Sequence, residues 1–290
     1  MTGNTKQRLL FFFIGIPTFI LAVLFLPFWN NALFFLIVAA LQVMAIYEMR
    51  GIFRAKAITI DAVRIAIFSF ATSGAVFASS FSAKESRTQF SSLEILLIMS
   101  AVSLLLIAGQ YAFIKKDDFE SALAEISASV FSFFYIGILG AFIVYTATCF
   151  PQKKEPVFLF TLMTFGNDSL AWLFGVTIGK RRDLFDVSPN KSIAGFIGGF
   201  LGSIFAGILG YFLFPEAGFS SISPLILMGA LMGCAVIVGD LLESALKRSA
   251  NVKDSGLVVP GRGGILDSSD SLLFSAPVFV FLSLLFGFFK

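Results

Sequence analysis

The chain has 290 residues, of which 57% are hydrophobic and 13% are charged, with a formal net charge of +3 and a mean hydropathy of +0.91. Soluble domains carry about 25% charged residues, so this chain lacks the polar sequence that would cover a soluble core of its size. It has no histidine, which excludes His-based catalytic triads, zincin motifs and haem ligation by His. The composition therefore indicates an integral membrane protein.

Apolar runs near 20 residues recur along the whole chain and predict an all-α, polytopic membrane protein with about nine transmembrane helices. The alternating pattern of β-barrel strands is absent. No repeat or linker divides the chain, so we expect one membrane domain over residues 1–290, with scaffold helices in 1–150 and the catalytic half in 151–290. The predicted spans are 9–28, 32–47, 65–82, 93–114, 123–149, 157–175, 194–214, 224–246 and 271–289.

The distribution of basic residues predicts the orientation of these spans. With the N-terminus in the cytoplasm, sixteen of the 21 Lys and Arg residues fall in cytoplasmic segments, as the positive-inside rule requires. The same orientation places the charged stretch from Gly239 to Asp270 at the cytoplasmic face, where nucleotides and Mg²⁺ are available. Glu48 and Arg50, at the end of the second span, are interpreted as interfacial anchors without a further role.

The stretch from Gly239 to Asp270 holds two acidic pairs. Asp240 and Glu243 are followed by Ser244 and Lys247 at spacings that place all four on one helical face. This group alone is equally compatible with a functional site and with a structural ion pair. The second pair, Asp267 and Asp270, lies at the start of the last span. Asp267 alone would be interpreted as a helix cap.

A basic, Gly-rich loop joins the two pairs, and its charged and glycine residues are Lys253, Asp254, Gly256, Gly261, Arg262, Gly263 and Gly264. Two acidic pairs beside such a loop favour Mg²⁺ and phosphate binding. Carboxylate oxygens are the ligands that Mg²⁺ prefers, and cations and glycine amides bind phosphate. The glycines could instead form only a turn.

A second polar group lies in the sixth span, where Asn167 and Asp168 fall in mid-span. Such a group is either a hydrogen-bonded knot between helices or the lining of a polar cavity, and the cavity is favoured. The following cytoplasmic loop contains Ser188, Lys191 and a Gly-rich helix start at Gly195–Gly199. This loop is a candidate contact for phosphates or anionic head groups, although a topology signal would also explain its charge.

The C-terminal half resembles the phosphatidate cytidylyltransferases, or CDP-diacylglycerol synthases. The resemblance rests on Gly239-Asp240-Leu241-x-Glu243-Ser244, on Ser244-x-Leu246-Lys247-Arg248-x4-Lys253-Asp254-x-Gly256-x3-Pro260-x-Arg262-Gly263-Gly264-Ile265-x-Asp267-x-x-Asp270, on Asn167-Asp168 and on Ser188-Pro189-x-Lys191-Ser192-x-x-Gly195-Phe196-x-Gly198-Gly199. The chain departs from the family pattern at Asn190, Ala194, Arg262 and Ser268.

The resemblance implies transfer of a cytidylyl group from CTP to phosphatidate, with release of pyrophosphate. It implies Mg²⁺ ligation by Asp240, Glu243, Asp267 and Asp270, with a second cation left open. Catalytic residues would be Asp240, Lys247, Arg248, Lys253, Asp267 and Asp270. Substrate contacts would come from Asp168, Ser188, Lys191, Ser244, Gly261, Arg262, Gly263 and Gly264.

The implied partners are CTP, phosphatidate or a related lipid phosphate, and membrane lipids, without nucleic acid and with a homodimer left open. The implied location is the bacterial inner membrane, with the active site facing the cytoplasm. Three alternatives stay open: a CTP-dependent enzyme acting on another lipid phosphate or polyprenol, a cation-binding transporter, and a family member that has lost catalysis. The transporter would require matching broken helices in two halves, and the sequence lacks that symmetry.

Overall fold

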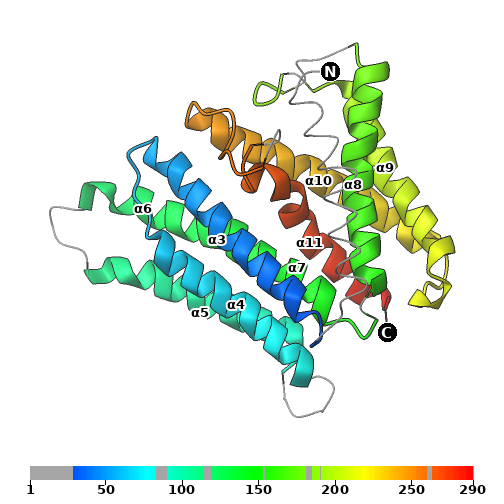
Figure 1. Ribbon diagram of the computed structural model, residues 1–290, viewed down its shortest axis with the longest axis horizontal. Helices are drawn as coiled ribbons and strands as arrows, with labels where there is room; N and C mark the ends of the chain where they lie inside the picture. The colour runs from blue at the N-terminus through cyan, green and yellow to red at the C-terminus, as the bar shows by residue number, and fades with distance from the viewer. Residues whose placement is uncertain are drawn as a thin grey trace. The chain divides into compact units, whose positions relative to one another are not determined.

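The computed structural model describes residues 29–82, 90–113, 119–152, 154–180, 185–189, 191–259 and 263–289. These residues are mostly helical, as Figure 1 shows. The α-helices are α3 (Ala32–Arg54), α4 (Ala62–Ser82), α5 (Ser92–Gly109), α6 (Phe119–Ser132), α7 (Leu139–Thr148), α8 (Lys154–Thr177), α9 (Ile193–Leu213), α10 (Ser223–Ser249) and α11 (Leu266–Phe286). The short helices are η2 (Gln110–Phe113), the π-helix η4 (Phe133–Ile138) and η5 (Pro215–Ala217).

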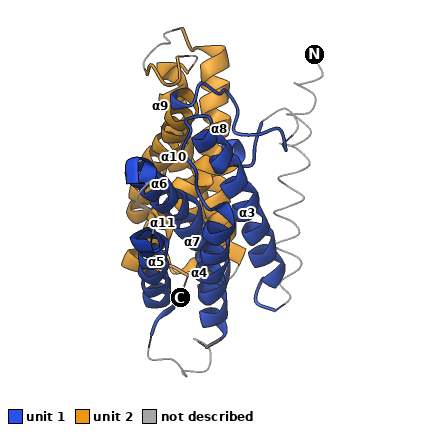
Figure 2. Cartoon of the chain, turned by 90° about the vertical axis from the view of Figure 1, so that its left-hand side faces the viewer, with its two compact units in different colours: residues 1–149, 249–268 blue, residues 150–248, 269–290 orange. Residues whose placement is uncertain are grey.

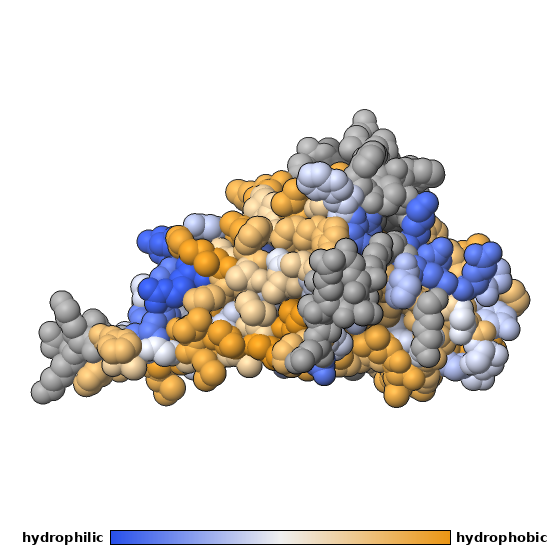
Figure 3. All heavy atoms as spheres, turned by 90° about the horizontal axis from the view of Figure 1, so that it is seen from below, coloured by the Kyte–Doolittle hydropathy of each residue, from blue (hydrophilic) through white to orange (hydrophobic). Residues whose placement is uncertain are grey.

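Eight helical stretches among the described residues are long and apolar enough to cross a membrane. They correspond to the second through ninth predicted spans, so the all-α, multi-span prediction is confirmed for this part of the chain. The first predicted span, residues 9–28, lies outside the described residues. Apolar side chains, drawn in orange, cover much of the described surface seen in Figure 3, as expected for helices that contact lipid.

The chain divides into two compact units, coloured separately in Figure 2. Unit 1 contains residues 1–149 together with residues 249–268, and unit 2 contains residues 150–248 together with residues 269–290. The Gly-rich loop between α10 and α11 therefore belongs to the same unit as the N-terminal helices. The predicted catalytic half, residues 151–290, includes this loop.

Unit 1 is built around α4, which packs against α3, α5, η4 and α7. Its buried centre contains a polar network around Gln42, next to the π-helix η4, whose carbonyl groups lack their usual helical donors. The Gln42 side chain donates to the carbonyls of Ile136 and Gly137 at 2.9 and 3.1 Å, and it accepts from the Ser73 hydroxyl at 3.0 Å. This network satisfies the backbone of the irregular segment within an apolar interior.

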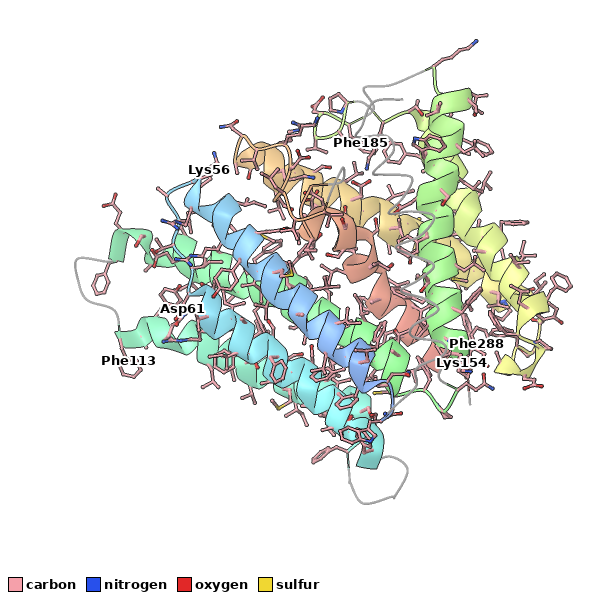
Figure 4. All side chains as sticks on the ribbon, viewed as in Figure 1. Lys56, Asp61, Phe113, Lys154, Phe185 and Phe288 are labelled. Carbon is pink, nitrogen blue, oxygen red and sulfur yellow. The ribbon has the colours of Figure 1, made fainter. Side chains whose placement is uncertain are left out.

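Charged side chains gather at one end of unit 1. Lys56 and Asp61 lie between α3 and α4, and Phe113 ends η2 at the same end of the unit (Figure 4). Arg64 and Asp61 form an exposed ion pair there, with 3.4 Å between the Arg64 Nε and Asp61 Oδ2 atoms. This is the end that the positive-inside count assigns to the cytoplasm.

Unit 2 contains a close helix pair, α8 and α9, whose contact depends on small residues. Along α9 the buried residues include Gly195, Gly198, Gly199, Gly202, Ala206, Gly207 and Gly210. A Cβ atom placed on Gly202 would lie 2.5 Å from the carbonyl oxygen of Gly166 on α8. Small residues that let two backbones approach this closely are typical of helix pairs in membranes.

Gly202→Ala should therefore destabilise unit 2. The added methyl group would meet backbone rather than a movable side chain, and overpacking of this kind costs about 1–3 kcal/mol. We expect a melting temperature several degrees below that of the wild type, measured by thermal unfolding in detergent. Gly109→Ala is the control, because nothing lies within 4 Å of a Cβ atom at Gly109. Equal melting temperatures for the two variants would contradict the close contact.

Candidate active site

In unit 1, the loop between α10 and α11 folds around the carboxylate of Asp267. Its Oδ2 atom accepts hydrogen bonds from the Ser255 and Gly264 amides at 2.8 and 2.7 Å and from the Ser255 hydroxyl at 2.9 Å. The loop is closed by an antiparallel bridge between Val259 and Gly263, with N···O distances of 2.8 and 3.0 Å. Asp267 thus holds the loop in place through donors that precede α11 and not through the amides of the helix itself.

A second carboxylate, from Glu48 on α3, also binds this loop. It accepts the amides of Ile265 and Leu266 at 2.9 and 2.8 Å and the Ser255 hydroxyl at 2.9 Å. Glu48 was interpreted from the sequence as an interfacial anchor without a further role, and that interpretation missed these contacts. Its only sequence signal was an acidic residue at the end of an apolar run, which does not reveal a partner more than 200 residues away.

The glycines of the loop make room for these carboxylates. A Cβ atom on Gly263, whose φ is 109°, would lie 2.5 Å from Asp267 Oδ2. A Cβ atom on Gly256 would lie 2.5 Å from Glu48 Oε1, and one on Gly264 would overlap Glu48 and Ser255. The close approaches that the structure shows at Gly263 and Gly264 are therefore to protein carboxylates, and their contact with a phosphate stays a prediction.

In unit 2, the predicted residues converge on Lys191. Its ammonium group pairs with Asp240 on α10. Burial lowers the pKa of Lys191, and the nearby carboxylates of Asp270 and Asp168 act to raise that pKa. Glu243 and Lys247 also lie within electrostatic range of the ammonium. Side chains from α8, α10, α11 and the loop before α9 are thus brought to one place.

The face of α10 that the spacing predicts is present in the structure. Glu243, 1% exposed, pairs with Lys247 one turn later, with 2.5 Å between Oε2 and Nζ. Arg248 donates from Nε to the Val187 carbonyl at 3.4 Å, which ties the end of α10 to the loop that contains Ser188. Ser244 lies on α10 between these groups and is partly buried.

The loop between α8 and α9 leads into a capped helix start. The Ser192 hydroxyl accepts the Gly195 amide at 3.1 Å and so caps α9. Lys191 is the residue before this cap, and its amide donates to the Ser188 carbonyl at 3.2 Å in a turn. A cation beside a helix N-terminus provides two favourable interactions for a phosphate group.

Asn167 belongs to a hydrogen-bonded knot. It is 2% exposed, and its amide donates to the Ser203 hydroxyl at 3.0 Å and to the Gly233 carbonyl at 3.4 Å. The contacts join α8, α9 and α10, which is the structural alternative that the sequence allowed. Its neighbour Asp168 instead interacts with Lys191.

The carboxylates of unit 2 have the chemistry that Mg²⁺ requires, because they are hard oxygen donors next to cations. Among the described residues, no three acidic or Cys side chains come close enough to enclose a metal ion. Mg²⁺ commonly takes one or two carboxylates and completes its shell with water and substrate phosphates, so this arrangement is compatible with it. Gly261 and Arg262 lie outside the described residues, and Lys253 is exposed.

The profile of the cytidylyltransferase family matches residues 6–286. A phosphatidate cytidylyltransferase of Synechocystis is 39% identical over 142 residues, covering 47% of this chain and 47% of the relative. An uncharacterized Escherichia coli protein, YnbB, is 40% identical over 120 residues, covering 41% and 39%. A phosphatidate cytidylyltransferase of Bacillus subtilis is 31% identical over 204 residues, covering 63% and 75%.

The matched region thus spans less than half the length of the first two relatives and three-quarters of the third. The family profile, in contrast, extends over nearly all of this chain, including the α10–α11 loop and the cluster around Lys191. The chain belongs to the cytidylyltransferase family.

Proposed function

We propose that the protein transfers a cytidylyl group from CTP to phosphatidate and forms CDP-diacylglycerol and pyrophosphate. The observation that carries the proposal is the convergence of Asp168, Asp240, Glu243 and Asp270 on Lys191 in unit 2. Membership of the cytidylyltransferase family gives the reaction class, and two of the relatives named above are phosphatidate cytidylyltransferases.

The reaction suits a chain without histidine. A phosphate oxygen of phosphatidate forms a bond to the α-phosphorus of CTP, and the bond from that phosphorus to the α–β bridging oxygen breaks to release pyrophosphate. The nucleophile is already an anion, so it does not require a strong general base. The protein has to align three groups in line and to offset the charge that develops on the phosphates.

Each charged residue then has a proposed role. Asp240, Glu243 and Asp270, with Asp267 one turn earlier on α11, would hold Mg²⁺ directly or through water. Bound Mg²⁺ would offset charge on the CTP phosphates and on the leaving pyrophosphate. The proposed contacts to CTP and pyrophosphate are Lys247, Arg248, Lys253 and Arg262, and Lys191 would orient the lipid phosphate beside the start of α9.

The proposed setting is the bacterial inner membrane, with the charged groups facing the cytoplasm. The spans let the lipid remain in the bilayer while its phosphate enters from the side, so the substrate need not be extracted. The proposal also allows a homodimer, which the family resemblance leaves open.

The test is an assay of purified protein with Mg²⁺, CTP and phosphatidate. We expect equal amounts of pyrophosphate and CDP-lipid, and no product from Asp267→Asn. Parallel reactions with a polyprenyl phosphate and with a polyprenol distinguish phosphatidate from the other lipids that the departures at Arg262 and Ser268 leave open. A protein that forms no CDP-lipid from any of these substrates would contradict the proposal.

A further inference from the structure

We propose that Glu48 is a positioning residue for the α10–α11 loop and, through Ser255, for Asp267. The catalytic part of this inference rests on the proposed function, whereas the structural part does not. All of the groups involved belong to unit 1: Glu48 lies on α3, and Ser255, Ile265, Leu266 and Asp267 lie in the segment 249–268.

Glu48 caps the N-terminus of α11 from another helix. The first amides of an α-helix have no acceptor within the helix. Those of Ile265 and Leu266 donate instead to the two different oxygens of the Glu48 carboxylate. A charged acceptor at this end of a helix is also favoured by the helix dipole. The start of α11, and with it the backbone of Asp267, is therefore fixed relative to α3.

Ser255 connects Glu48 to Asp267. Its hydroxyl oxygen lies 2.9 Å from Glu48 Oε2 and 2.9 Å from Asp267 Oδ2, and it can donate its single proton to either. The same oxygen accepts from the Asp267 amide at 3.4 Å. A change in the position of Glu48 would therefore be passed to the carboxylate of Asp267 through one side chain.

The packing around Glu48 distinguishes positioning from simple surface anchoring. An interfacial anchor points toward water or head groups, but Glu48 fits against Gly256 and Gly264, where a side chain would overlap its carboxylate. Three donors from the loop surround the group. Residues that orient a metal ligand in this way typically change metal affinity or activity by about 10–100-fold when they are replaced.

Glu48→Gln is the informative substitution. The amide keeps the size of the side chain but has a single acceptor oxygen, and its NH₂ group would face the amide of Ile265 or Leu266. Glu48→Asp keeps both acceptor oxygens on a chain one methylene shorter. We therefore expect Glu48→Gln to disturb the loop more than Glu48→Asp does. Glu120→Gln is the matched control, because Glu120 is an exposed acid in the first turn of α6 in the same unit.

The first measurement is amide hydrogen exchange, which does not require activity. In Glu48→Gln we expect exchange in peptides covering 251–268 to increase about tenfold, with peptides from α4 and α5 unchanged. Glu120→Gln should exchange as the wild type does. Unchanged exchange in 251–268 would overturn the inference, and so would faster exchange throughout unit 1, which would indicate a purely structural role.

The second measurement is the CTP-dependent reaction. We expect Glu48→Gln to raise the half-saturating Mg²⁺ concentration and lower kcat by about tenfold or more, with a smaller change in KM for CTP. Glu48→Asp should recover part of the loss. Ser255→Ala should add little to Glu48→Gln, because both act through one contact. Full activity in Glu48→Gln would overturn the positioning role and leave the proposed function intact. An inactive wild type would contradict the proposed function. The exchange data would still show whether Glu48 positions the α10–α11 loop.

Discussion

Asp270→Asn is expected to lower the turnover of CTP by about 10²–10³-fold, with little change in the amount of folded protein. Asp270 is 6% exposed on α11 and acts electrostatically on Lys191. Asn has nearly the same shape, so the substitution removes a charge and leaves the packing intact. Losses of this size are typical when one preorganised charged or polar group is removed from an active site.

Asp270→Asn tests catalysis with less effect on folding than Asp267→Asn would have. The Asp267 carboxylate accepts three hydrogen bonds from the loop, so Asp267→Asn would disturb the loop together with any metal. Asp270 instead accepts through Oδ1 from the amide of Ser271, the next residue, at 2.7 Å. The oxygen of an Asn side chain could still accept that hydrogen bond.

The measurement combines a rate with a melting temperature. CDP-lipid formation is followed over a range of Mg²⁺ concentrations, and thermal unfolding in detergent reports the folded state. Glu216→Gln serves as the control, because Glu216 is an exposed acid in η5 of the same unit. If Asp270→Asn kept more than about a tenth of the wild-type turnover, the cluster around Lys191 could not be the catalytic centre.

The helices could be predicted because one physical signal determines them. Runs of apolar residues long enough to cross a bilayer leave little alternative to a helix, so eight spans were located within a few residues at most ends. The largest difference lies on α3, which continues to Arg54 although the predicted span ends at Tyr47. Hydropathy marks the part of a helix in lipid and gives no sign of helical turns beyond it.

The extension of α3 explains why Glu48 was missed. With the predicted span ending at Tyr47, Glu48 is interpreted as an interfacial anchor, a position where an acid needs no partner in the protein. In the helix it accepts three hydrogen bonds from the α10–α11 loop. Helical spacing could indicate that Glu243 and Lys247 share a face, because they are on one helix. It could not indicate contacts between residues more than 200 positions apart.

Lys191→Met should have opposite effects on metal binding and on turnover. The Lys191 ammonium lies among carboxylates that are the proposed Mg²⁺ ligands, so it competes electrostatically with the metal. Without it, we expect the half-saturating Mg²⁺ concentration to fall by about tenfold, since the repulsion between two cations near each other at a protein surface amounts to several kcal/mol before screening. Turnover with phosphatidate should fall by about 10²-fold or more, because the lipid phosphate loses its proposed cationic partner.

The folded protein should tolerate this substitution. Burial lowers the pKa of Lys191, which means that the folded state disfavours its charged form relative to the unfolded chain. Removing that charge therefore should not by itself reduce the melting temperature, and the measured melting temperature of the variant shows whether a loss of turnover comes from unfolding. Lys154→Met is the control, since Lys154 is exposed at the start of α8. It lies at the opposite end of unit 2 from Phe185, which belongs to the same α8–α9 loop as Lys191 (Figure 4).

The two effects together distinguish the proposed role from its alternatives. If the ion pair with Asp240 served only to stabilise the fold, the substitution would lower the melting temperature and would not raise the affinity for Mg²⁺. If Lys191 bound only the nucleotide, its replacement would raise KM for CTP and leave the dependence of the rate on phosphatidate unchanged. Tighter Mg²⁺ binding combined with slower transfer to phosphatidate requires a cation that shares the carboxylates with the metal and contacts the lipid phosphate.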